Sequence, residues 1–213
     1  MKAIYKSDSL NLSLYKLPTS IIFNDDKIKT KLVEELADND FEVINNTVLK
    51  LNISVREYLK VYDFNMSYVP YFKLENYMSK KISFLDYETL IYIKLIGFLS
   101  HKENIFIFDD ILSFLSDERK ERILKYINEN NIMYVNITSD IEETLFSQYL
   151  IVLGEKGVLI EGEVKKVLME EKLLKKLGFN LPFVLDLSLQ LKAYEVIDQE
   201  YYDLDKLVND LWN

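Results

Sequence analysis

Short apolar runs alternate with segments of helical spacing over much of this chain, and that alternation limits the fold more than any other feature. The runs at residues 20–23, 105–108 and 132–137 are short and bounded by polar turns, which is typical of buried strands. The segments at 28–36 and 117–128 carry apolar residues three or four positions apart, which indicates helices. Strands alternating with helices favour right-handed βαβ units, so we predict an α/β fold with a mainly parallel sheet.

The second half of the chain adds a hairpin and then turns helical. Two apolar runs, at 149–153 and 158–161, flank Gly154-Glu155-Lys156-Gly157 and predict a hairpin at the edge of the sheet, which makes the sheet mixed. Helical spacing then follows at 163–177, 182–191 and 203–211. We therefore expect a main domain over residues 1–162 and a helical appendage over residues 163–213.

Composition excludes several classes of protein. The chain has 213 residues, of which 49% are hydrophobic and 29% charged, as expected of a folded globule, and no apolar stretch approaches the roughly 20 residues that span a bilayer. It has no Cys and a single His, His101, so thiolate and multi-histidine metal centres are excluded. The net charge of −9 argues against a general nucleic-acid binder. We expect a cytoplasmic protein, and we expect no nucleic-acid partner.

Short motifs follow the strand at 105–108 in a fixed order. The strand ends in two acids, Asp109 and Asp110, and Thr138-Ser139-Asp140 follows the next strand; the hairpin then ends in Ile160-Glu161-Gly162. This series resembles the ATP-binding subunits of ABC transporters, which have a P-loop NTPase fold. An isolated Asp-Asp pair is equally typical of a turn cap, so the resemblance depends on the order of the motifs.

The resemblance implies roles for three of these residues. Asp109 would assist Mg²⁺ through water, and Asp110 stands where a glutamate normally positions the attacking water. Ser139 stands where the family has a switch histidine that senses the γ-phosphate. Because serine cannot perform that task, the resemblance implies a degenerate switch.

The phosphate-binding loop of the family can be aligned with residues 23–30, but its glycines are missing. Lys29 and Thr30 fall on the phosphate-binding lysine and the Mg²⁺-binding hydroxyl of the pattern G-x-x-x-x-G-K-[ST]. Phe23 and Ile28 replace the two framing glycines, and we expect them to obstruct the loop. Taken alone, Lys29-Thr30 is more often a solvated helix face than a nucleotide site.

The signature sequence of the family aligns with Leu85-Asp86-Tyr87-Glu88-Thr89, at the predicted start of a helix. In the family this helix start contacts the γ-phosphate bound by the opposite subunit. Asp86 and Glu88 would instead bring negative charge toward a polyphosphate, so the signature is also degenerate. The segment at 37–84 is short for the family and has no convincing Q-loop glutamine, while residues 173–182 resemble the tail of energy-coupling-factor transporter ATPases.

These observations favour a degenerate ABC ATPase-like subunit that does not hydrolyse ATP and has a structural or regulatory role. It would pair with a competent ABC ATPase or with itself, at a membrane permease and thus peripherally at the inner face of the membrane. It would need no cofactor, or Mg-ATP if nucleotide binding is retained. Two alternatives stay open: a divergent active ATPase that uses Lys29, Thr30, Asp109 and Asp110, and a soluble adaptor that kept only the fold.

Overall fold

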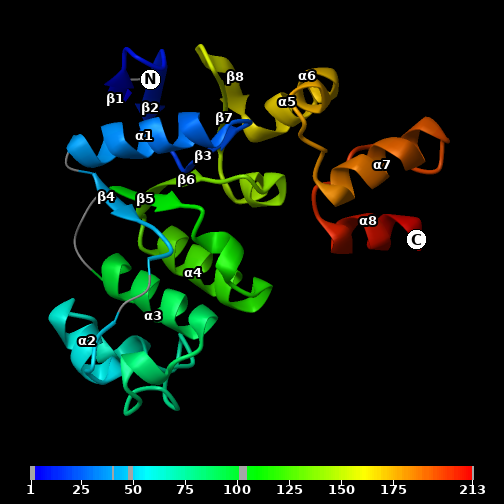
Figure 1. Cartoon of the computed structure of the whole chain (residues 1–213). Coiled ribbons are helices and arrows are strands. Elements are labelled where there is room, and N and C mark those ends of the chain that lie inside the picture. Colours follow the sequence, from blue (N-terminus) through cyan, green and yellow to red (C-terminus); the bar gives the residue numbers. More distant parts are fainter. Residues whose placement is uncertain (1–2, 40, 48–49, 101–104, 213) are drawn as a thin grey trace.

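A mixed six-stranded sheet forms the centre of the molecule, with helices on both faces (Figure 1). The computed structural model describes residues 3–39, 41–47, 50–100 and 105–212. The order of the strands is β4-β5-β6-β3-β7-β8. Their bounds are β3 Thr19–Phe23, β4 Glu42–Ile44, β5 Ile105–Asp109, β6 Met133–Ile137, β7 Tyr149–Gly154 and β8 Gly157–Glu163.

The pairing of the strands confirms the predicted sheet. All the pairs are parallel except β7 with β8, which form the edge hairpin. Every residue of β3 and of β6 is buried, because helices cover both faces of the sheet at these strands. The parallel arrangement brings the carboxyl ends of β3, β5 and β6 to one edge, where a site can form.

One face of the sheet is covered by helix α1 (Asp26–Asp38) and by a hairpin of β1 (Ala3–Ser7) and β2 (Leu12–Tyr15). The apolar side chains of α1 pack on alternate strand residues such as Ile21 and Ile107, as the period of a strand requires. The hairpin was not predicted, although Leu10, Leu12 and Leu14 alternate with polar residues. Carboxylate oxygens of Glu35 in α1 accept hydrogen bonds from the side chains of the hairpin.

The opposite face is covered by a helical unit that includes α2 (Val55–Val61), α3 (Tyr87–Leu99) and α4 (Asp117–Glu129). The largest buried cluster of the molecule lies here, between these helices and strand residues such as Phe106 and Phe108. Gly97 permits close contact between α3 and α2, because a Cβ at that position would lie 2.9 Å from the Tyr58 ring. Short 3₁₀ turns occur at Met66–Tyr68, Ile82–Phe84, Leu112–Phe114 and Ile141–Phe146.

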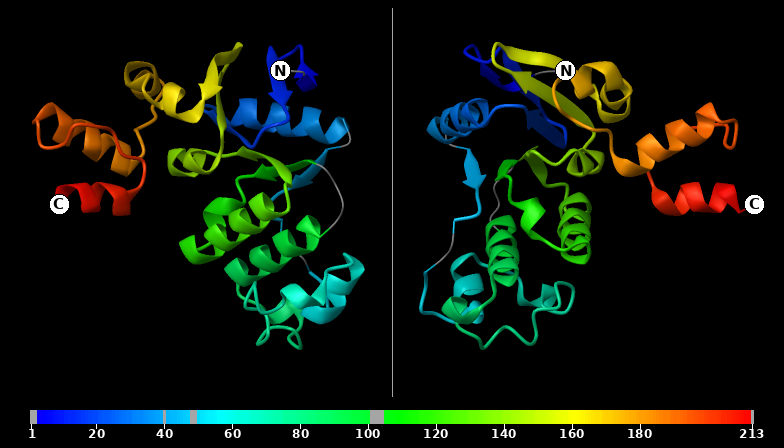
Figure 2. Two further views of the ribbon diagram at one scale, coloured as in Figure 1. Left: turned by 180° about the vertical axis from the view of Figure 1, so that it is seen from behind. Right: turned by 45° about the vertical axis from the view of Figure 1, so that its right-hand side comes forward.

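The C-terminal helices are α5 (Val164–Leu168), α6 (Glu171–Lys176), α7 (Phe183–Ala193) and α8 (Leu204–Leu211). The prediction of one helix at 163–177 is wrong, because the chain breaks at Met169 and Glu170. The break allows Leu174 to join Leu168 in a core beneath β7. Figure 2 shows α7 and α8 beyond the sheet, where they share a small core of their own.

Three of the sequence predictions concern a membrane span, a domain boundary and His101. No helix among the described residues is long and apolar enough to cross a bilayer. The proposed boundary after residue 162 stays a prediction, and His101 lies outside the described residues.

Candidate functional site

Lys29, Asp109 and Asp110 meet at the edge where β3 and β5 end. The Lys29 ammonium lies 2.9 Å from Asp109 Oδ1 and 3.0 Å from Asp110 Oδ2, so one cation joins two carboxylates. The three side chains are 21%, 17% and 25% exposed. Water therefore screens these interactions only in part. The structure thus brings together three of the four residues that sequence analysis assigned to nucleotide and Mg²⁺.

The charge of Lys29 is stabilised by these partners. Burial lowers the pKa of Lys29, but the hydrogen bonds and charges of Asp109 and Asp110 outweigh burial, and the pKa rises above its ordinary value. The contribution of Lys29 to stability is therefore complete below its unfolded pKa and is lost only as the pH rises through the higher folded pKa. At neutral pH Lys29 is a cation whose charge is already balanced.

The connection between β3 and α1 contains only Asn24 and Asp25. The helix begins at Asp26, so the residues aligned with the phosphate-binding loop are already wound into its first turn. The Lys27 amide donates to the Asp25 carboxylate, and the Ile28 and Lys29 amides donate to the Asp25 carbonyl. A phosphate cradle needs such amides free. In this chain the three amides already donate hydrogen bonds to Asp25.

The other residues of this alignment also take structural places. Phe23 and Ile28 are buried in the core against α1 and the sheet, so the expectation that they obstruct a loop is wrong: there is no loop for them to obstruct. Thr30 is exposed, and its hydroxyl donates to the Asp26 carbonyl within the helix at 2.9 Å. This hydrogen bond is common for threonine inside helices.

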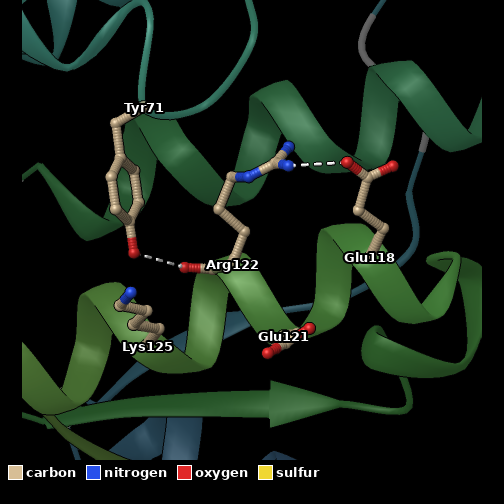
Figure 3. Close-up of a pocket in the computed structure, with 5 residues that line it drawn as sticks. All are labelled: Tyr71, Glu118, Glu121, Arg122 and Lys125. Atoms are coloured by element: carbon tan, nitrogen blue, oxygen red, sulfur yellow. Dashed lines mark hydrogen bonds and ion pairs between the residues drawn. The ribbon is translucent and has the colours of Figure 1, made fainter.

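A pocket of about 490 Å³ lies beside Lys29. Carboxylates of Asp26, Glu34 and Asp109 line it, against the single ammonium of Lys29. The excess of negative charge opposes a polyphosphate. A second pocket, of about 280 Å³, lies on α4 away from this site (Figure 3).

Among the residues aligned with the signature, Asp86 caps helix α3. Its carboxylate accepts a hydrogen bond from the Thr89 amide at 2.9 Å, and Glu88 accepts one from the Ser116 amide at 2.9 Å. Arg119 lies 3.4 Å from Glu88 and donates to the Thr89 hydroxyl. The negative charges that were expected to repel a partner's nucleotide are thus engaged within the chain.

The remaining signature residues have structural contacts. Leu85 packs on the large core beneath α3, and the Tyr87 hydroxyl donates to the Asn46 carbonyl at 3.1 Å. The helix start is therefore closed by its own carboxylate at Asp86. An external anion would have to displace that carboxylate.

Replacing Glu88 with glutamine is expected to reduce the loss of stability in acid. The Ser116 amide and Arg119 lower the pKa of Glu88, so its contribution is present above the unfolded pKa and is lost as the pH falls through the lower folded pKa. Glutamine does not titrate, so the free energy of unfolding of the variant should fall less between pH 6 and pH 3 than that of wild type. The two decreases should differ by under about 1 kcal/mol. Urea unfolding at the two pH values checks this. An equal pH dependence in both proteins would contradict the assignment.

The switch position contacts the acidic pair through its backbone. The Ser139 amide lies 3.3 Å from Asp110 Oδ1 and donates to it, while the Asp140 carboxylate caps the following turn. The Thr138 amide donates to the Ile21 carbonyl of β3. Backbone amides of the segment after β6 thus donate hydrogen bonds to β3 and to Asp110, and the Ser139 side chain takes no part in these contacts.

Sequence analysis missed a buried lysine on α3. The Lys94 ammonium donates to the Asn45 carbonyl at 2.8 Å, to Asn45 Oδ1 at 3.3 Å and to the Thr47 carbonyl at 3.1 Å. These acceptors belong to the segment that leaves β4, beside the acidic pair. A single lysine within the apolar helix α3 was the available signal, but the acceptors could not be predicted from it.

These observations test whether Mg-ATP fits the site. The Lys27, Ile28 and Lys29 amides already donate to Asp25, and the Lys29 ammonium is paired with two carboxylates. A phosphate at this place would have to compete with these contacts, so we derive no catalytic step through Mg-ATP.

Comparison with known proteins adds to the description. No protein-family model matches the chain. It is 31% identical over 125 residues to the energy-coupling factor transporter ATP-binding protein EcfA1 of Lactobacillus delbrueckii subsp. bulgaricus, covering 56% of this chain and 44% of that protein. It is 24% identical over 144 residues to EcfA1 of Mesomycoplasma hyopneumoniae, covering 66% of this chain and 52% of the relative. The chain thus spans about half the length of these curated relatives.

Solved structures share the fold. The ATP binding subunit of an ABC transporter superposes with a TM-score of 0.65 at 13% identity, covering 83% of this chain and 94% of that one. The cbiO1 protein of Clostridium perfringens, described as part of the ABC transporter complex cbiONQ, has a TM-score of 0.61 at 14% identity, covering 81% and 88%. The chain therefore has the fold of the ATP-binding cassettes of ABC transporters. Part of its sequence is similar to the ATP-binding proteins of energy-coupling factor transporters.

Proposed function

We propose that this chain is a non-hydrolysing ABC ATPase-like subunit with a structural or regulatory role. The observation that carries the proposal is the wound connection at Asp25, whose carboxylate and carbonyl take the Lys27, Ile28 and Lys29 amides. A phosphate cannot use these amides unless the first turn of α1 opens. The balanced Lys29 supports the same conclusion.

The partners follow from the relatives. One structural neighbour is described as part of a complex, cbiONQ, and the sequence relatives are named as transporter subunits. We propose that this chain pairs with a competent ABC ATPase, or with a second copy, at a membrane permease, and that it lies at the cytoplasmic face of the membrane. Residues 163–213 would form a helical appendage to an ATPase-like domain over residues 1–162.

Millimolar Mg-ATP is expected to shift the melting temperature of the purified protein by less than about 1 °C, because the amides and the lysine are occupied. A ligand at one hundred times its Kd would add about 2.7 kcal/mol of stability, which is readily measured. The competent relative EcfA1 serves as the positive control. ATP turnover by this chain that is lost on Asp110→Asn would overturn the proposal.

A divergent active ATPase remains the second candidate, because Lys29, Thr30, Asp109 and Asp110 are present. That function requires a nucleotide-dependent gain in stability that disappears on Lys29→Ala. A soluble adaptor is the third candidate. Copurification with a permease and a second ATPase, on coexpression with the genes that flank this one, supports the transporter role, and its absence supports the adaptor.

A further inference from the structure

Helix α8 presents an apolar stripe to solvent. The side chains of this α8 stripe recur at the spacing of one helical face, and they are Leu204, Val208, Leu211 and Trp212. Leu207 points the other way, into the small core that α8 shares with α7, and both helices lie beyond the sheet (Figures 1 and 2). Of the 15 large hydrophobic side chains that are exposed in the described structure, seven fall within residues 183–212. Exposed apolar surface is therefore concentrated here, as at a site of protein contact.

The same part of the chain is strongly acidic. Residues 183–213 contain seven Asp and Glu against two Lys, so they carry a net charge of −5, more than half of the −9 of the whole chain. Residues 163–182 contain five Lys against three Glu, so the acidity begins only with α7. On α8, Asp205 and Asp210 are exposed and form no hydrogen bond or ion pair within the described part of the chain. The apolar stripe is thus accompanied by acidic side chains that have no bonded cation.

This charge distinguishes the possible occupants of the stripe. A second copy packed stripe to stripe would bring a net charge of −5 against another of −5, and like charges oppose each other across a contact. An anionic lipid surface would meet the same repulsion. A helix with apolar residues every three or four positions fits the stripe, and Lys and Arg on its flanks fit the charge.

We propose that the α8 stripe docks a basic amphipathic helix of another protein. The inference goes beyond the proposed function, because it holds whether or not this chain binds nucleotide. The apolar residues of the partner pack on the α8 stripe, and its Lys and Arg side chains lie near Asp205 and Asp210. The Trp212 ring is buried in the contact, where tryptophan contributes more than smaller side chains do.

Trp212 reports on this contact, because it is the only tryptophan of the chain and is 84% exposed. The probe is an amphipathic peptide of leucine and lysine with about 18 residues, a length that can form a helix. Its counterpart has glutamate in place of every lysine. The leucine–lysine peptide should shift the fluorescence emission of Trp212 to shorter wavelength, and it should bind more weakly as salt is added. The leucine–glutamate peptide should leave the emission unchanged.

The double variant Val208→Ser with Leu211→Ser removes the centre of the α8 stripe and keeps Leu207 in the core of α7 and α8. Its dissociation constant for the leucine–lysine peptide should be at least about tenfold higher than that of wild type, because two aliphatic contacts are lost. The double variant Val61→Ser with Leu159→Ser is the matched control, since it makes the same two changes at exposed residues of α2 and β8. The control should bind the peptide as wild type does.

The acidic side chains are tested separately. The variant Asp205→Asn with Asp210→Asn keeps the α8 stripe, yet it should bind the leucine–lysine peptide more weakly and with less dependence on salt. Binding by this variant that equals wild type in strength and in salt dependence would overturn the role of charge in the proposal.

The other occupants give different results. Vesicles of phosphatidylglycerol, and a rise in the concentration of the protein alone, should leave the emission of Trp212 unchanged. A shift caused by the vesicles would identify a membrane surface, and a shift on concentration with dimers in sedimentation would identify a second copy; either result overturns the proposal. Equal binding of the two peptides, or of the stripe variant and its control, overturns it as well. None of these measurements uses nucleotide, so their outcome is separate from that of the ATP experiments.

Discussion

Replacing Glu143 with alanine is expected to lower the free energy of unfolding by about 3 to 5 kcal/mol, the cost of removing one member of a buried ion pair. The Glu143 side chain is 0% exposed and lies 3.2 Å from the ammonium of Lys120, which is itself only 11% exposed. Its second oxygen accepts a hydrogen bond from Asn136 Nδ2 at 2.9 Å. The variant would leave a buried cation without its anion and a buried amide without its acceptor. Urea unfolding followed by circular dichroism measures the loss.

Glu121→Ala is the matched control, because Glu121 lies on the exposed face of α4 and makes no hydrogen bond or ion pair within the described ranges. Its effect should remain within about 0.5 kcal/mol. The double variant Lys120→Met with Glu143→Leu should recover most of the stability, because it removes both charges together. A Glu143→Ala protein as stable as wild type would show that the pair is not desolvated in solution.

Replacing Phe72 with alanine should also cost about 3 to 5 kcal/mol, because the ring is 1% exposed and its removal leaves a cavity. Phe72 belongs to the largely irregular segment between α2 and α3. Its ring contacts Tyr71 at 4.9 Å and Tyr126 of α4 at 5.1 Å between centroids. Tyr71 adds a hydrogen bond from its hydroxyl to the Arg122 carbonyl of α4 (Figure 3). Aromatic packing thus holds this segment together with the backbone hydrogen bonds of its turns.

The loss of stability should therefore be accompanied by local opening of the segment between α2 and α3. Limited proteolysis of Phe72→Ala is expected to cut within residues 62–86 faster than in wild type. Phe84→Ala is the control of the same residue type, because that ring is 80% exposed and its removal leaves no cavity. Equal stability of Phe72→Ala and Phe84→Ala would contradict the proposed role of the aromatic contacts of Phe72 with Tyr71 and Tyr126.

Much of the sheet could be predicted, because most of its strands are short apolar runs bounded by polar turns, and this pattern is visible in the local sequence. The strands at 20–23, 105–108 and 132–137 and the edge hairpin were all identified, and so was the mixed sheet. The helix predicted at 163–177 was wrong for a tertiary reason. Its periodicity is continuous, but packing beneath β7 favours two short helices over one.

The aligned motifs place Lys29, Asp109 and Asp110 at one edge of the sheet, and the structure has these three side chains in contact. Their roles toward nucleotide and Mg²⁺ stay predictions, and the early start of α1 was not foreseen. The spacing from Phe23 to Lys29 fits a phosphate loop, so length alone could not reveal that the helix begins early. Asp25 carried the signal, since aspartate is a favoured N-cap.

The partners in two buried polar contacts could not be predicted from the local sequence. Lys94 with Asn45, and Lys120 with Glu143, join residues 49 and 23 positions apart in the chain. Only the packing of helices against the sheet decides which buried donor meets which acceptor. A lone lysine in an apolar helix, such as Lys94, indicates that it has a polar partner but not which residue that partner is.

The early start of α1 also sets what a phosphate-binding loop at this place would require. Exchanging Phe23 and Ile28 for glycine would restore the letters of the motif, yet both side chains belong to the core and the amides would still be wound into a helix. A working loop needs the first turn of α1 to unwind, which discards the Asp25 cap and exposes apolar surface. Each single step toward that loop lowers stability before any ligand can compensate. Engineering such a loop therefore calls for a redesigned start of α1 and for new core contacts in place of Phe23 and Ile28, and not for two glycines alone.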